Sequence, residues 1–170
     1  MRIAEKHAAP AARAVARRAA QDGATNAGVL DFERIYHASA MERIELIKDG
    51  VGAVCIFLLA ERMATSQDRL IAVLGFPRTT VMRKSKSNES LSIEQTERVV
   101  GLSRLIGQVQ SMVEESGEPS GFDAAQWVAQ WIERPNPALG GGAPAELMDT
   151  VAGQELVGAV LARMQGGAYA

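Results

Sequence analysis

Aromatic residues are scarce in this sequence: they make up 5% of 170 residues, although hydrophobic residues as a whole make up 47%. The core of a β-rich protein favours aromatic and β-branched side chains, whereas alanine, leucine and methionine favour helices. Alanine is abundant along the whole chain, and no segment has the pattern of a strand. The composition therefore predicts an all-α fold.

Cysteine is almost absent as well, since Cys55 is the only one. A single cysteine excludes an intramolecular disulfide and fits a reducing compartment, and its place in an apolar run predicts a buried small hydrophobe, not a nucleophile. That run, residues 51–60, is too short to cross a membrane, and the N-terminus lacks the apolar core of a signal peptide. We therefore expect a soluble cytoplasmic protein without membrane contact.

The residue sets of common metal sites and active sites are also missing. His7 and His37 stand alone, without cysteines or carboxylates at ligand spacing, so no metal site is expected. The glycines 140–142 lack the lysine and the serine or threonine of a phosphate-binding loop, and no Ser/His/Asp set is apparent. We expect neither enzyme activity nor a cofactor.

Charge is distributed unevenly, although the net charge is only −2. Residues 1–28 carry five basic and two acidic residues with few large hydrophobic ones, which predicts a flexible basic arm. Residues 29–115 carry eleven basic and twelve acidic residues, whereas residues 116–170 carry two and six. The linker-like stretch "EESGEPSG" lies where these two regions meet. The acidic end suits a basic protein surface better than nucleic acid.

Hydrophobic spacing predicts the helices of the first two thirds of the chain. Apolar residues recur three and four positions apart over residues 44–59, with Gly50 and Gly52 marking a start or a break of that helix. Residues 92–112 form a longer helix that a serine and a glutamine open as a capping box.

The last third is predicted to hold a helix pair. Asp123 caps a helix with Trp127 and Trp131 on one face, because the two are four residues apart. A Pro- and Gly-rich connection follows, and Pro144 is expected to open a helix whose apolar stripe, within residues 147–164, these tryptophans cover.

The stretch "QDRLIAVLGFPRTTVMRKSK", residues 67–86, has the spacing of a helix-turn-helix, with Ser66 capping the first helix, Gly75 at the turn and Pro77 opening the second. Its core-facing residues would be Leu70, Ile71, Leu74 and Val81. The residues exposed to phosphates and base edges would be Arg78, Thr79, Thr80, Arg83, Lys84 and Lys86. Spacing alone leaves two interpretations open, DNA contact or a helical corner with a solvated basic face, because Ile71 stands where a small residue is usual and Pro77 where serine is.

The C-terminal third resembles a known family through one set of residues: Trp131, Pro135, Asn136, Pro137, Leu139, Gly140, Gly141, Pro144, Leu147, Thr150, Gly153, Val157, Leu161 and Gly166. Together with the upstream stretches "LGFPRTTVMRK" and "LSIEQTERVVGLSRLI", it is similar to the Xre/MbcA/ParS-type antitoxins of bacterial RES-domain toxin–antitoxin pairs. The likeness covers about residues 30–170 and leaves the basic arm without a counterpart. It implies an Xre-like helix-turn-helix domain at 29–115 and a small helical toxin-binding domain at 116–170.

The resemblance also implies partners and a mechanism. The partner would be a RES-domain toxin that consumes NAD, either by degrading it or by ADP-ribosylating a protein, and the C-terminal domain would mask its active site. Members commonly repress their own operon and form dimers. The toxin-binding residues would be Trp131, Asn136, Leu139, Glu146, Asp149, Glu155, Arg163, Tyr169 and Ala170.

The final residues "MQGGAYA" are predicted to plug the toxin's NAD site, with Tyr169 as the only large side chain beyond the glycines. Three other interpretations stay open. The tryptophans and leucines fit a plain helical hairpin that packs on its own domain equally well. The chain could also be a stand-alone helix-turn-helix regulator with a C-terminal dimerisation module, or an adaptor whose helix-turn-helix is vestigial.

Overall fold

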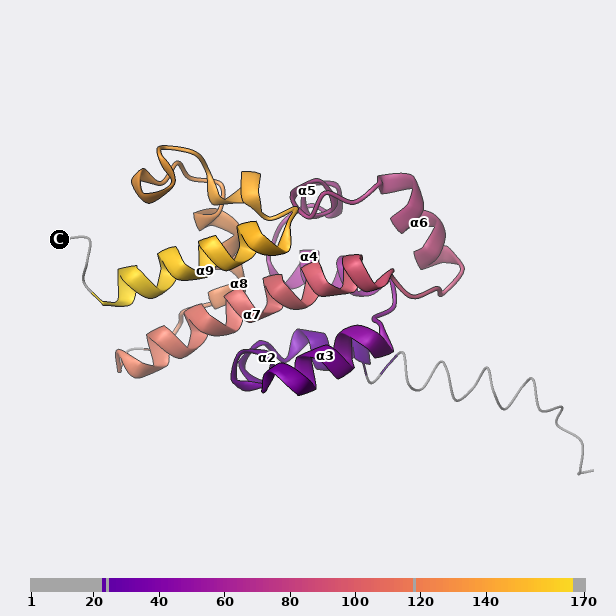
Figure 1. The fold of residues 1–170 in the computed structure, drawn as a ribbon, viewed down its shortest axis with the longest axis horizontal. Helices are drawn as coiled ribbons and strands as arrows, with labels where there is room; N and C mark the ends of the chain where they lie inside the picture. The colour runs from indigo at the N-terminus through magenta and orange to yellow at the C-terminus, as the bar shows by residue number, and fades with distance from the viewer. Residues whose placement is uncertain (1–22, 24, 118, 167–170) are drawn as a thin grey trace, which may run out of the picture.

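The computed structural model describes residue 23, residues 25–117 and residues 119–166, and in this part of the chain every regular element is helical (Figure 1). The all-α prediction is confirmed, apart from one isolated bridge between Gly52 and Ser90. The α-helices are α2 (Phe32–His37), α3 (Ala40–Asp49), α4 (Cys55–Arg62), α5 (Gln67–Val73), α6 (Arg78–Lys86), α7 (Ile93–Glu115), α8 (Ala124–Trp131) and α9 (Val151–Gln165). Two short 3-10 helices, η1 (Pro137–Leu139) and η2 (Pro144–Leu147), lie between α8 and α9.

The folded part of the chain begins earlier than the boundary predicted at residue 28. Residues 25–30 are helical, and Asn26 is buried where its Oδ1 accepts a hydrogen bond of 2.9 Å from the backbone N–H of Gly52. A buried amide with a long-range backbone partner is part of the packed structure. The rest of the predicted arm, apart from Gly23, lies outside the described residues.

The predicted apolar helix over residues 44–59 is broken in two at its glycines. Gly50 ends α3 with a φ of +79°, a left-handed value that glycine adopts without strain. The next residues pair with residues 89–91, with Val51 accepting a hydrogen bond from Leu91 and Ala53 donating one to Glu89. The helix resumes as α4, so the glycines mark a break.

Helix α7 forms the centre of the molecule and contacts α2, α3, α8 and α9. The capping box predicted at Ser92 and Gln95 is present, and the helix runs three residues beyond the predicted end at Met112. Gly107 allows α2 to approach closely, because a Cβ there would stand 2.0 Å from the carbonyl oxygen of Phe32.

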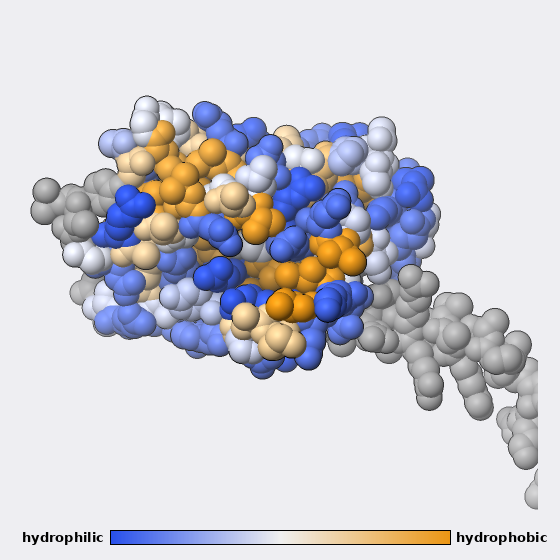
Figure 2. All heavy atoms as spheres, viewed as in Figure 1, coloured by the Kyte–Doolittle hydropathy of each residue, from blue (hydrophilic) through white to orange (hydrophobic). Residues whose placement is uncertain are grey.

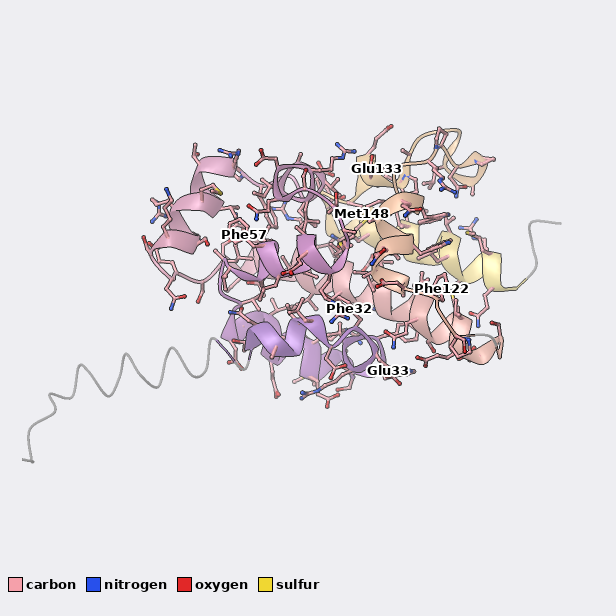
Figure 3. All side chains as sticks on the ribbon, turned by 180° about the vertical axis from the view of Figure 1, so that it is seen from behind. Phe32, Glu33, Phe57, Phe122, Glu133 and Met148 are labelled. Atoms are coloured by element: carbon pink, nitrogen blue, oxygen red, sulfur yellow. The ribbon has the colours of Figure 1, made fainter. Side chains whose placement is uncertain are left out.

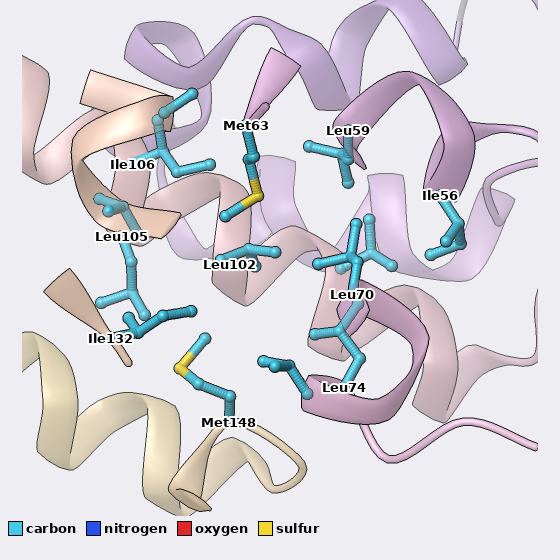
Figure 4. Packing of buried hydrophobic residues seen from close by; sticks show 14 of the residues in the cluster. Ile56, Leu59, Met63, Leu70, Leu74, Leu102, Leu105, Ile106, Ile132 and Met148 are labelled. Atoms are coloured by element: carbon cyan, nitrogen blue, oxygen red, sulfur yellow. The ribbon is translucent and has the colours of Figure 1, made fainter. Parts of the chain in front are cut away.

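A single core joins the two regions that the sequence separates. Leu70 and Leu74 of the helix-turn-helix lie in the same buried cluster as Ile132 and Met148 of the C-terminal third (Figure 4). All four side chains are at most 3% exposed. The helix-turn-helix and the C-terminal helices therefore pack as one body.

Candidate DNA-contact and toxin-binding surfaces

The helix-turn-helix forms as its spacing predicts. Ser66 accepts a hydrogen bond from the N–H of Arg69 at the start of α5, and Gly75 adopts a φ of +65° at the turn. Pro77 is the residue before α6 and not its first residue, so the helix begins one position later than predicted. Ile71 is accommodated as a buried core residue, and the predicted core residues Leu70, Leu74 and Val81 are buried with it.

The predicted DNA-contact residues lie on α6, at the edge of the molecule away from α8 and α9 (Figure 1). Three of its four cations already have partners: Arg78 Nε lies 2.6 Å from Asp68 Oδ1, Arg83 Nη1 lies 2.7 Å from Glu89 Oε1, and Lys84 Nζ donates to the carbonyl of Ser90. Both carboxylate pairs are exposed, so each contributes little free energy and can be exchanged for a phosphate. The arrangement remains compatible with DNA contact and with a solvated helical corner.

Trp131 belongs to the core. It is 9% exposed and stacks on Trp127 at a centroid distance of 5.6 Å, which confirms that the two share one face of α8. Phe122 packs beside this pair in a tilted arrangement, with its ring centroid 6.3 Å from that of Trp127. Trp131 therefore supports the C-terminal region as a buried core residue.

Hydrogen bonds within the Pro- and Gly-rich connection between α8 and α9 hold it in place. Asn136 Oδ1 accepts a hydrogen bond from the N–H of Ala138, and its backbone N–H donates to Gly142, which closes the loop around η1. Pro144 opens only η2, and α9 begins at Val151 after the cap of Thr150. Asn136 thus holds the loop, and Leu139 is partly buried beside it.

The charged residues predicted to bind toxin do not gather at one spot in the fold. Glu146 and Asp149 precede α9, Glu155 lies in its second turn, and Arg163 lies in its last turn. Glu155 and Arg163 are eight positions apart within α9, which corresponds to about 12 Å along the helix. Tyr169 and Ala170 lie outside the described residues.

The structure also has a groove that the sequence did not predict, between α3 and α9 with α7 as its floor. It encloses about 600 Å³ and combines apolar and charged lining, including Ile44, Val100 and Val151 with Arg104 and Glu155. Figure 2 shows hydrophobic residues gathered on this face of the molecule. The sequence signal was the row of small residues on α9, which leaves room beside α7.

Cys55 is fully buried in α4, and this burial raises the pKa of its thiol to about 12. The predicted role as a small core residue is confirmed. In the described part of the chain, no group of three or more histidine, cysteine, aspartate or glutamate residues is placed to hold a metal ion. No helix there is both long and apolar enough to cross a membrane.

Comparison with protein families matches both halves of this architecture. Residues 42–104 match the antitoxin Xre-like helix-turn-helix domain, and residues 121–167 match the antitoxin Xre/MbcA/ParS C-terminal toxin-binding domain. The chain belongs to the Xre/MbcA/ParS antitoxin family. A relative from Sphingobium sp. (strain YBL2), the "Prs ADP-ribosylating antitoxin", is 42% identical over 139 residues, which cover 82% of this chain and 87% of the relative.

The family assignment gives the two surfaces their context. Helices α5 and α6 lie within the helix-turn-helix match, and α8, η1, η2 and α9 lie within the toxin-binding match. Seven of the nine predicted toxin-binding residues fall in the latter, and the remaining two, Tyr169 and Ala170, follow it. The antitoxin therefore carries both segments on one shared core.

Proposed function

We propose that this antitoxin binds a cognate RES-domain toxin through residues 121–167 and masks the toxin's NAD-consuming active site, without catalytic activity of its own. The observation that carries the proposal is the family match to a toxin-binding domain, which presents exposed carboxylates at Asp149 and Glu155. The name of the relative, "Prs ADP-ribosylating antitoxin", supports ADP-ribosylation as the reaction of the toxin. We place this function in the cytoplasm, where a reduced Cys55 is expected.

Autorepression is the second part of the proposal. The Xre-like helix-turn-helix matches over residues 42–104, and α6 presents Thr79, Arg83 and Lys86 on its surface side. Such a helix contacts phosphates through its cations and reaches base edges with arginine or threonine. The antitoxin would then bind its own operator.

Self-association is the third part, and we assign it to the groove between α3, α7 and α9. Ile44 and Val151, which line it, are 40% and 37% exposed. Along α7, Glu97 lies seven residues before Arg104, about 10 Å apart on a helix. In a pair of copies related by a two-fold axis, Glu97 of each copy would lie near Arg104 of the other. This charge complementarity favours a homodimer.

The decisive experiment is coexpression of the antitoxin with the RES-type protein encoded by the neighbouring gene. We expect the two proteins to copurify and the toxin's NAD consumption to be blocked. A variant lacking residues 166–170 should still copurify but inhibit less, if the predicted tail plug operates. Full inhibition by that variant would leave masking to the helices alone.

The alternative function makes the opposite prediction. A stand-alone transcriptional regulator with a C-terminal dimerisation module would bind the operator, but it would bind no RES-type protein and leave NAD consumption unchanged. Failure of copurification would favour that alternative. The antitoxin with Arg83 and Lys84 changed to alanine serves as a control, since this change lies on α6 and should not affect inhibition.

A further inference from the structure

The basic arm contains a long segment without acidic residues. Residues 6–21 carry Lys6, Arg13, Arg17 and Arg18, and no aspartate or glutamate. Both family matches begin after this segment, at residues 42 and 121, so neither assigns it a function. The four cations lie outside the described residues. Their function is therefore inferred from their charge and from the place where the arm joins the fold.

The arm joins the fold beside the segment that follows α6. Asn26, in the helical residues 25–30, accepts the hydrogen bond of 2.9 Å from the N–H of Gly52, and Gly52 is bridged in turn to Ser90. The fit is close, because a Cβ on Gly52 would stand 3.0 Å from Nδ2 of Asn26. The root of the arm, at Asn26, is therefore fixed against residues 52 and 90.

The cations of α6 hold the same segment from its other side. Lys84 Nζ donates to the carbonyl of Ser90 at 3.1 Å, and Arg83 Nη1 lies 2.7 Å from Glu89 Oε1. Figure 1 shows the end of α3, the end of α6 and the start of α7 on one side of the molecule. The root of the arm is thus joined through Gly52 and Ser90 to the helix that is predicted to contact DNA.

The acidic C-terminal third is a second candidate partner for a basic arm. Figure 3 shows Phe122 and Glu133 of that third on the opposite side of the molecule from α6. Glu89, the acid beside the root, already pairs with Arg83. Operator DNA contacted by α6 would instead bring a dense row of phosphates close to the root. The position of the root therefore favours DNA as the partner of the arm.

We propose that Arg13, Arg17 and Arg18 bind phosphates of operator DNA beside the site contacted by α6. Arg18 lies eight residues before Asn26 and Arg13 lies thirteen before it, so an extended chain would reach at most about 28 Å and about 45 Å. One turn of B-DNA spans about 34 Å, so these lengths cover phosphates on either side of α6. The inference rests on the proposed operator binding, to which the arm adds affinity and α6 adds sequence preference.

The test is operator titration by fluorescence anisotropy, with the full-length antitoxin and a triple variant in which Arg13, Arg17 and Arg18 are changed to glutamine. Loss of three phosphate contacts should reduce the slope of log K against log salt by about 2.7, at about 0.9 for each phosphate. The ratio of wild-type to variant affinity should therefore be about 40-fold larger at about 50 mM salt than at about 200 mM. Affinity for an unrelated duplex should fall by the same factor, because phosphate contacts carry no sequence information.

Two further variants serve as controls. Arg34, Arg134 and Arg163 are exposed arginines outside the helix-turn-helix, and changing all three to glutamine removes the same charge. This variant should keep the wild-type salt slope. Changing the three arginines of the arm to lysine preserves their charge and should preserve the slope as well, because lysine binds phosphate as a point charge. An equal loss of slope in the lysine variant would overturn the phosphate contact.

Hydroxyl-radical footprinting supplies the second readout. The wild type should protect backbone positions next to those that the glutamine variant of the arm still protects. Equal affinity, slope and footprint in the two proteins would overturn the arm contact, and a weaker copurification of toxin in addition would assign the arm to the toxin instead. Absence of operator binding by the wild type would overturn the proposed operator binding, and the arm contact with it.

Discussion

Gly101 of α7 makes room for the side-chain amide of Gln154, because a Cβ on Gly101 would stand 1.8 Å from Gln154 Oε1. Alanine normally stabilises a helix by about 1 kcal/mol relative to glycine. Here Gly101→Ala should instead destabilise the fold by at least about 1 kcal/mol, since displacing a buried amide from its two carbonyl partners costs about 1–3 kcal/mol. Urea denaturation followed by circular dichroism measures the change.

Gly28 provides the control for that substitution. It lies in the helical segment 25–30, and a Cβ there would meet nothing within 4 Å. Gly28→Ala should be neutral or stabilising by up to about 1 kcal/mol. An equal effect of the two substitutions would show that Gln154 does not depend on the space at Gly101.

Trp131 should be essential for folding. Truncation of a buried tryptophan to alanine costs about 3–5 kcal/mol, a large part of the stability of a chain of this size. We expect Trp131→Ala to abolish toxin binding through unfolding, seen as a decrease in helical circular dichroism. Phe122→Ala, at a ring that is 37% exposed, should have a much smaller effect. A folded and fully protective Trp131→Ala would contradict the packing of α8.

Operator binding should depend on the second helix of the helix-turn-helix. Replacing Arg83 and Lys84 with alanine should weaken binding and reduce the slope of log K against log salt by about 0.9 for each phosphate that is no longer neutralised. Lys48→Ala, an exposed cation on α3, should change neither quantity. Unchanged operator affinity in the double variant would remove α6 from the mechanism.

Removing the carboxylate that pairs with Arg83 should strengthen operator binding, whereas removing Arg83 itself should weaken it. Glu89→Gln removes the carboxylate that lies 2.7 Å from Arg83 Nη1, so the guanidinium becomes available to a phosphate. Operator affinity should rise at low salt, and the gain should shrink as salt screens the exposed charges. Weaker binding by Glu89→Gln would show that the pair itself holds α6 in its DNA-binding position.

Self-association through the groove should be sensitive to charge at Ile44. Ile44→Glu places a carboxylate in the apolar lining and should shift the antitoxin toward monomer in sedimentation velocity at micromolar concentration. Ile93→Glu changes another exposed isoleucine, 61% exposed in the first turn of α7 and outside the groove, where an acid is favourable. An Ile44→Glu protein with the wild-type sedimentation coefficient would rule out this interface.

Local signals in the sequence predicted local structure correctly. Ser66, Ser92 and Asp123 each cap a helix by accepting a hydrogen bond from the N–H three residues on, an interaction that short-range spacing encodes. At Pro144 the prediction of a longer helix is wrong, because proline suits the first turn of a 3-10 helix as well as that of an α-helix.

Long-range contacts were not predictable in the same way. Arg98 meets Asp149 across 51 residues and Arg69 meets Glu133 across 64, and nothing in either neighbourhood indicates the partner. The sequence also suggested two separate domains from the linker-like stretch at 114–121, whereas burial of Met148 beside Leu74 depends on tertiary packing. The small residues on α9 were a local signal of the groove, but they could not show which helices line it, since three helices distant in sequence build it.

The shared core also bears on how a protease would degrade the chain. If the C-terminal helices unfold, Leu70 and Leu74 lose their contacts with Ile132 and Met148 in the shared cluster. Cleavage within residues 114–121 would therefore leave neither fragment with a complete core. A protease that cleaves only unfolded molecules would then depend on global unfolding of the chain and not on local unfolding of one end. A toxin that stabilises one end would lengthen the lifetime of the whole chain, and a single proteolytic event would release the toxin and the operator together.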